Sequence, residues 1–99
     1  MNRKQFYALL DEVVAEIFAA ANAEEMMLMD VKRALMQHER SRELWRAYCE
    51  TLKVGFGGWM IWDFDDRFEN NMRNLCSFDI VRKEVDGRKR RILIKRVGK

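Results

Sequence analysis

Residues 78–97 read FDIVRKEVDGRKRRILIKRV. Two runs rich in β-branched and apolar residues, Phe78–Glu84 and Lys89–Val97, lie on either side of Val85-Asp86-Gly87. The glycine stands where a hairpin turn needs a positive φ, and strand-like runs joined by three to five residues with a glycine are typical of a β-hairpin. The stretch therefore predicts an antiparallel hairpin at the C-terminal end of the sequence.

The length of the turn sets the register of this hairpin. A three-residue connection at positions 85–87 pairs Phe78 with Ile94 and Ile80 with Ile92, which gathers four apolar side chains on one face. A two-residue Asp-Gly turn would pair Phe78 with Lys95 instead. We expect the longer connection.

The N-terminal part of the sequence has helical periodicity. Asn2 and Gln5 match a capping box, in which each side chain satisfies a free backbone N–H of the other residue. An apolar stripe then recurs every three or four residues, which predicts an amphipathic helix over residues 3–21. Its members are Phe6, Leu9, Leu10, Val13, Val14, Ile17, Phe18 and Ala21.

Three more helices follow from periodicity and capping residues. They are expected over about Glu25–Gln37, from an N-cap at Ser41 up to the glycine-containing stretch Val54–Gly58, and from Asp65 or Asp66 to about Cys76. The bulky run Trp59–Trp62 suits either a short third strand or an aromatic plug. The prediction is an α+β fold of about four helices followed by the hairpin. It forms one domain over residues 1–99, mainly helical over 1–76 and a basic hairpin over 77–99.

Composition limits the class of protein. The chain has 99 residues, 48% hydrophobic and 35% charged, which is enough for one modest core and excludes a disordered tail. No apolar run approaches the roughly 18 residues of a membrane span. Two cysteines are too few for a disulfide scaffold, and the acidic residues among the first 23 do not suit a signal peptide. We therefore expect a cytoplasmic protein that does not span a membrane.

Charge is unevenly distributed along the sequence. Residues 1–70 hold nine Lys/Arg and thirteen Asp/Glu, a net charge of −4, whereas residues 71–99 hold ten and three, a net charge of +7. A basic hairpin can neutralise phosphates and release counterions, so the segment indicates nucleic-acid binding. The alternative is that the charges only keep an edge strand from pairing with other chains. The candidate phosphate ligands are Arg88, Lys89, Arg90, Arg91 and Lys95.

The last predicted helix adds polar side chains beside the hairpin. Arg67, Asn71 and Asn74 share the side away from its apolar residues, and such groups can contact bases or phosphates. A helix followed directly by a basic hairpin resembles the last part of a winged-helix DNA-binding domain, over roughly Asp65–Lys95. That family has a helix-turn-helix before the wing, whereas this sequence has glycines and aromatics over Val54–Phe64. The resemblance is one of architecture and implies a DNA-binding function by analogy.

Catalytic and metal-binding patterns are weak. His38 is the only histidine, and it suits a helix end whose last carbonyls it satisfies. Cys49 and Cys76 lack the paired spacing of a zinc site and are expected to be small core residues. In the acidic motif Trp62-Asp63-Phe64-Asp65-Asp66, the dipole of a helix N-terminus explains Asp65 and Asp66 without a metal. We expect a non-enzymatic binding module without metal or cofactor.

Two other functions remain open from the sequence. The stripe of the first helix and a methionine cluster suit a protein partner or a homodimer. A small-molecule binder lined by Trp45, Trp59 and Trp62 is the other alternative. The candidate partner-binding residues are Phe6, Leu10, Val13, Ile17, Met26, Met27 and Met29.

Overall fold

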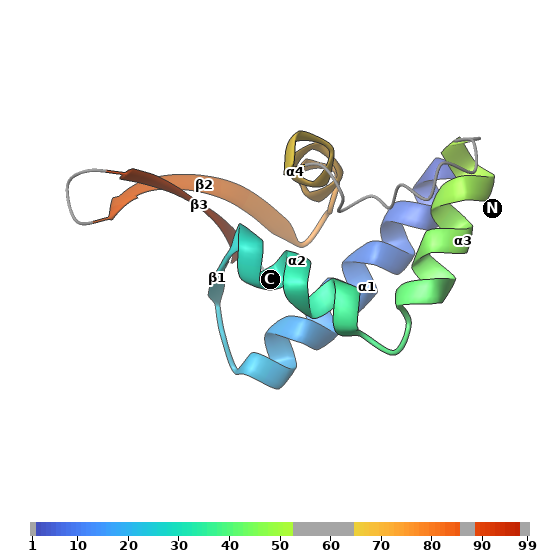
Figure 1. Ribbon diagram of the computed structural model, residues 1–99, viewed down its shortest axis with the longest axis horizontal. Helices are drawn as coiled ribbons and strands as arrows, with labels where there is room; N and C mark the ends of the chain where they lie inside the picture. Colours follow the sequence, from blue (N-terminus) through green and yellow to red (C-terminus); the bar gives the residue numbers. More distant parts are fainter. Residues whose placement is uncertain (1, 53–64, 86–88, 98–99) are drawn as a thin grey trace.

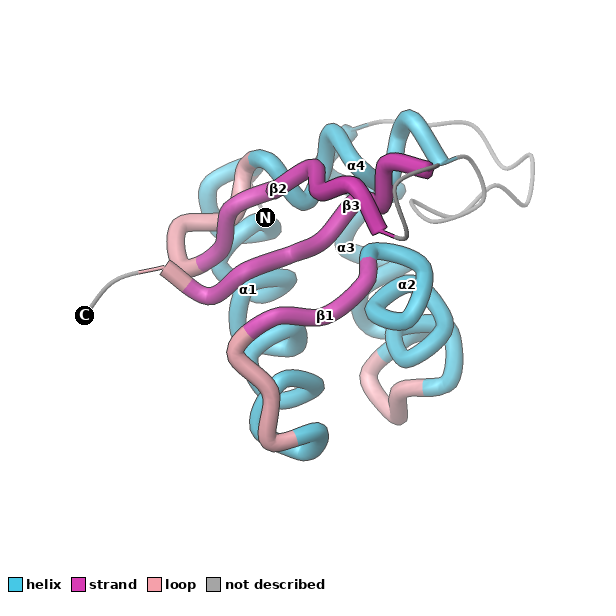
Figure 2. The backbone as a smooth tube through the Cα atoms, turned by 90° about the vertical axis from the view of Figure 1, so that its left-hand side faces the viewer, coloured by secondary structure: helices cyan, strands magenta, loops and turns pink. Residues whose placement is uncertain are grey.

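The computed structural model describes residues 2–52, 65–85 and 89–97. In chain order the elements are α1 (Arg3–Ala21), β1 (Glu25–Met27), α2 (Leu28–Gln37), α3 (Ser41–Leu52), α4 (Asp65–Arg73), β2 (Phe78–Val85) and β3 (Lys89–Arg96). The strands form one antiparallel sheet in the order β1-β3-β2. The predicted α+β fold with four helices and a C-terminal hairpin is confirmed. Figure 1 shows the hairpin reaching away from the helices, and Figure 2 shows the sheet lying over α1.

Helix α1 begins and ends where its sequence predicts. The Asn2 side chain accepts a hydrogen bond from Gln5 N, and the Gln5 side chain accepts one from Asn2 N, both at 2.9 Å, so the capping box forms. Asn22 ends the helix in the left-handed conformation with φ 51°, and its N–H donates to the carbonyl of Ala19. Asparagine tolerates this conformation better than most residues with a side chain.

The core lies between α1 and the inner face of the sheet. The apolar stripe of α1 packs against side chains of the other helices and of the hairpin. The Phe18 and Phe78 rings, from α1 and β2, meet at a centroid distance of 4.8 Å. The backbone N–H of Ser77 donates to Asp11 Oδ2 at 2.9 Å, which ties the start of the hairpin to α1. The largest fully buried side chains are Phe6, Phe18, Phe68, Phe78, Leu10, Leu35, Leu44, Met72, Ile94 and Val13.

The third strand of the sheet differs from the prediction. Glu25–Met27, expected as the first turn of a helix, is strand β1, and Met26 lies opposite Ile94 of β3. Pairing with a strand almost seventy residues away outweighs the local helical pattern, because it places Met26 against the core, a contact that local periodicity does not reveal. The candidate strand Trp59–Trp62 lies outside the described residues.

The hairpin register also differs. Phe78 lies opposite Arg96, and Ile80 lies opposite Ile94, so the pairing is shifted by two residues from the expected one. The connection between the paired residues Val85 and Lys89 does have three residues, but they are positions 86–88. A shift of two leaves every side chain on its predicted face, so apolar patterning cannot separate the two registers.

Helix α4 is shorter than predicted. It ends at Arg73, and the next two backbone N–H groups, of Asn74 and Leu75, donate to Asn71 and Met72 with the tighter i→i−3 spacing. Cys76 is consequently exposed, and Cys49 is half-buried, so the expectation that both are core residues is wrong for Cys76.

Candidate nucleic-acid interface

The basic segment forms a two-stranded arm. Strand β1 pairs with β3 from Lys95 to Leu93. Beyond Leu93 the described sheet continues as two strands, with Arg82–Val85 opposite Lys89–Ile92. We call these eight residues the hairpin arm. It extends along the longest axis of the molecule, away from α1 and α3 (Figure 1).

Arg82 and Arg91 are the basic residues of the arm whose side chains the structure describes. Arg82 lies opposite Ile92, and Arg91 lies opposite Lys83. Both arginines are exposed. Lys89 and Arg90 are placed in β3 by their backbone, but their side chains lie outside the described part of the structure, as does all of Arg88.

Glu69 joins the hairpin arm to α4. Its carboxylate accepts hydrogen bonds from Arg82 Nη2 at 2.8 and 2.9 Å and from Arg73 Nη2 at 2.7 Å. Only 15% of the Glu69 side chain is exposed, whereas about half of each arginine side chain is. One carboxylate therefore holds two guanidinium groups side by side at the base of the arm. We call this group the arginine junction, and its formal charge is +1.

Sequence reasoning missed the arginine junction. The i,i+4 spacing of Glu69 and Arg73 is visible in the sequence and is typical of an ion pair on a helix. The partnership with Arg82 depends on the packing of α4 over β2, which no local pattern reveals.

Lys95 lies between two acidic residues in the register of the sheet. Its register partners are Glu25 on β1 and Asp79 on β2. Directly opposite residues on one face of a sheet have Cβ atoms about 5 Å apart, so one basic and two acidic residues share this row of the sheet. The excess of positive charge is thus on the hairpin arm and not on the sheet below it.

The polar residues of α4 are not all on its solvent side. Asn71 is 6% exposed, and its Oδ1 accepts a hydrogen bond from the Tyr7 hydroxyl at 2.9 Å. The expected exposed position of Asn71 is therefore wrong, because the amide joins α4 to α1. Asn74 is exposed, and its Nδ2 donates to the Asn70 carbonyl at 2.8 Å. The side chain of Arg67 lies outside the described part.

The candidate protein-binding stripe of α1 belongs to the domain's own core. Phe6, Leu10 and Val13 are fully buried, and Ile17 is 6% exposed. Of the methionines, Met26 and Met27 are half-buried in β1, and Met29 is 40% exposed at the start of α2. The stripe is therefore unavailable to a partner, and this part of the expectation is wrong. Of the tryptophans expected to line a small-molecule pocket, Trp59 and Trp62 lie outside the described residues.

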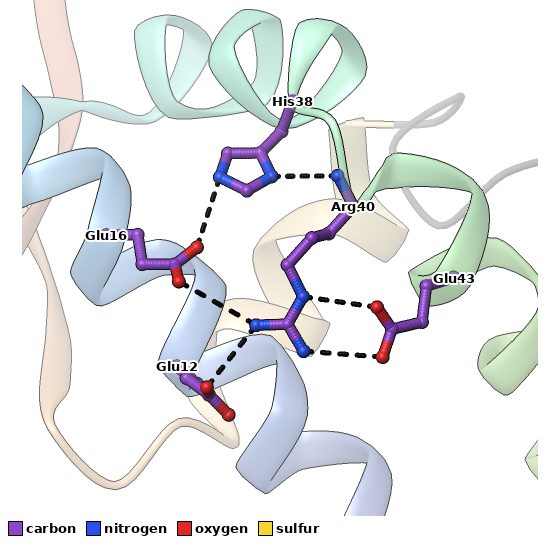
Figure 3. A network of polar contacts seen from close by, with 5 residues as sticks. All are labelled: Glu12, Glu16, His38, Arg40 and Glu43. Atoms are coloured by element: carbon purple, nitrogen blue, oxygen red, sulfur yellow. Dashed lines mark hydrogen bonds and ion pairs between the residues drawn. The ribbon is translucent and has the colours of Figure 1, made fainter.

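A polar network joins α1 to the connection between α2 and α3 (Figure 3). Arg40 Nε and Nη2 donate to the two carboxylate oxygens of Glu43 at 3.1 and 3.3 Å, and Nη1 lies 3.3 Å from Glu12 Oε1. Hydrogen bonding to Glu43 raises the pKa of Arg40 above its usual value, and the same contact lowers the pKa of Glu43. Arg40 thus links the first turn of α3 to α1 at the surface.

His38 belongs to the same network. Its Nδ1 accepts a hydrogen bond from the backbone N–H of Arg40 at 3.0 Å, and its Nε2 lies 3.2 Å from Glu16 Oε2. An accepting Nδ1 places the proton of the neutral ring on Nε2, facing the carboxylate. The ring therefore organises the turn by accepting an N–H, whereas the sequence led us to expect it to satisfy the last carbonyls of α2.

Other chemistry is not assembled in the described part of the chain. Residues 2–52, 65–85 and 89–97 bring together no group of three or more His, Cys, Asp or Glu side chains that could hold a metal ion. Among the described helices, none is long and apolar enough to cross a membrane. No protein-family model, curated protein or solved structure matches this chain.

Proposed function

We propose that the chain is a small nucleic-acid-binding protein whose hairpin arm contacts phosphates. The observation that carries the proposal is that the most basic part of the sequence forms a two-stranded arm that extends from the body of the protein. Residues 82–91 contain six Lys/Arg and two Asp/Glu, and their strands form the two-stranded arm beyond the three-stranded part of the sheet. A two-stranded β-ribbon is one of the elements that a nucleic-acid groove admits.

The density of like charge supports a polyanionic partner over a role in solubility alone. Single charged residues on an edge strand are enough to discourage pairing with other chains. A net charge of +4 within ten residues repels itself, and a phosphate backbone relieves that repulsion while its counterions are released. The acidic body and the basic arm would also orient the protein in the field of a polyanion.

The arrangement of the helices gives secondary support. Helices α2 and α3 are joined by three residues, the length of a helix-turn-helix connection, and they precede the hairpin in the sequence. The sequence also predicts these two helices, and α4 lies between them and the hairpin, so they support the winged-helix resemblance without completing it. The described exposed face of α3 carries Arg42 and Arg46 together with Glu43 and Glu50, so its charge is balanced. We therefore assign the main contact to the arm and not to α3.

Fluorescence anisotropy with a labelled 20-base-pair DNA duplex tests the proposal. Wild-type protein is expected to bind at 50 mM salt and to weaken steeply toward 200 mM. Arg88→Glu/Arg90→Glu is expected to lose at least about tenfold in affinity, since each phosphate contact contributes through counterion release.

Arg3→Glu/Arg46→Glu is the matched control. It makes the same change in net charge at exposed positions on α1 and α3 and is expected to lose far less. Absence of binding at 50 mM salt, or an equal loss in both double variants, would overturn the proposal.

A further inference from the structure

The two described arginines of the arm lie on its opposite faces. Phe78 and Ile94 are buried in the core, which identifies the inner face of the hairpin. Side chains alternate along a strand, so Arg82, four residues after Phe78, is on the inner face. Arg91, three residues before Ile94, is on the outer face, where it is exposed. The hairpin arm therefore presents positive charge on both sides.

The position of these arginines along the arm matches the depth of a groove. With a rise of about 3.3 Å per residue, Arg82 lies about 10 Å and Arg91 about 7 Å from the Val85–Lys89 pair that ends the described arm. The major groove of B-form DNA is about 8.5 Å deep. The described arm thus extends beyond each arginine by a distance comparable to the depth of the groove, which places both arginines near the level of the phosphates when the outer part of the arm is inside the groove.

The thickness of the arm also fits. Face-to-face sheets pack about 10 Å apart, so a single ribbon with its side chains occupies about 10 Å, and the major groove is about 12 Å wide. The minor groove, about 6 Å wide, is too narrow for it. A-form RNA has a deep and narrow major groove that protein side chains do not reach.

In the arginine junction, Arg82 and Arg73 lie where an anion on the inner side of the arm can reach them. In the contacts described above Glu69 accepts from one nitrogen of Arg82, and a guanidinium has five N–H donors, so Arg82 retains donors for a phosphate. Arg73 lies beside it on α4 and is about half exposed. Helix α4 packs over the base of β2, so it limits how far the arm can enter a groove (Figure 1).

We propose that the hairpin arm enters the major groove of B-form duplex DNA end-on, with Arg82 and Arg73 contacting phosphates on one side of the groove and Arg91 contacting phosphates on the other. This inference rests on the proposed function and names its ligand as double-helical DNA. It predicts a preference over duplex RNA and separate contributions from the two faces of one ribbon.

The test measures anisotropy with three 20-mer probes of one sequence: duplex DNA, duplex RNA and single-stranded DNA. Duplex DNA is expected to bind at least about tenfold more tightly than duplex RNA. Methyl green, which occupies the major groove, is expected to displace the protein, whereas netropsin, which occupies the minor groove, is not. Arg82→Gln and Arg91→Gln are each expected to weaken DNA binding about tenfold at 50 mM salt and to lower the salt slope by about 0.9.

Circular dichroism checks that each variant is folded. If Arg82→Gln is not, Arg73→Gln tests the same side and leaves the Arg82–Glu69 contact in place. Equal binding of duplex RNA, displacement by netropsin and not methyl green, or an effect confined to one face overturns groove entry and leaves the proposed function standing. Failure of all three probes to bind overturns the proposed function itself.

Discussion

Replacing Phe78 with alanine tests how the hairpin is attached to the helices. The Phe78 side chain is 2% exposed and meets the Phe18 ring at 4.8 Å between centroids. Truncation of a buried phenylalanine costs about 3–5 kcal/mol, because the lost transfer free energy and the remaining cavity add. A chain of this size has a free energy of unfolding of about 5–15 kcal/mol, so the loss is a large fraction of the total.

Urea unfolding followed by far-UV circular dichroism measures this loss. With a slope of about 2 kcal/mol per molar urea, a loss of about 4 kcal/mol lowers the midpoint by about 2 M. Val81→Ala is the matched control, since Val81 is in the same strand, is half-buried and is on the outer face. Its expected cost is about 1 kcal/mol.

Similar midpoints for the two variants would refute the reasoning. They would mean that the outer face of β2, which carries Val81, is packed as tightly as the inner face, which carries Phe78. The inner and outer faces of the hairpin arm would then be misassigned, and with them the placement of Arg82 and Arg91 on opposite sides.

Two further predictions concern α1. Asn2→Ala removes the capping box and is expected to cost about 1 kcal/mol, seen as a fall of about 5 °C in Tm, whereas Lys4→Ala, an exposed change in the same turn, should leave Tm nearly unchanged. Equal shifts would contradict the cap. Burial raises the pKa of the Tyr7 hydroxyl in the folded protein, although the charge of Arg3 opposes the change. As the pH rises, the unfolded chain therefore loses the phenolic proton at a lower pH than the folded protein does. The stability that Tyr7 contributes is therefore complete below about pH 10, its unfolded value, and is lost as the pH rises through the folded one. Urea midpoints of wild type and Tyr7→Phe measured from pH 8 to 11 should converge with rising pH, and parallel curves would count against this.

Elements with strong local signals could be predicted from the sequence. Helix α1 has both a capping box at Asn2 and an apolar stripe, and its bounds agree with the prediction. The hairpin likewise carries its own pattern, with alternating apolar residues around Asp86-Gly87. These signals depend on residues close together in the chain, so no knowledge of the packing is needed.

The candidate site was only partly predictable. The concentration of positive charge after residue 70 is a property of the sequence, and it predicts a basic hairpin. The roles of single residues depend on what lies across from them. Register places Lys95 opposite Glu25 and Asp79, and Asn71 is buried where it accepts a hydrogen bond from Tyr7.

The sequence by itself determined the helices, the hairpin and the separation of an acidic body from a basic C-terminal segment. Only the tertiary structure decided that Glu25–Met27 is a strand and that Ile80 lies opposite Ile94. It also decided that Glu69 joins two arginines at the base of the arm. The physical reason is that helical periodicity is a local property, whereas strand pairing and ion pairs are selected by the energy of contacts between distant segments. A two-residue shift in register preserves every inward-facing side chain, so the packing of the core must choose between registers that the pattern leaves equivalent.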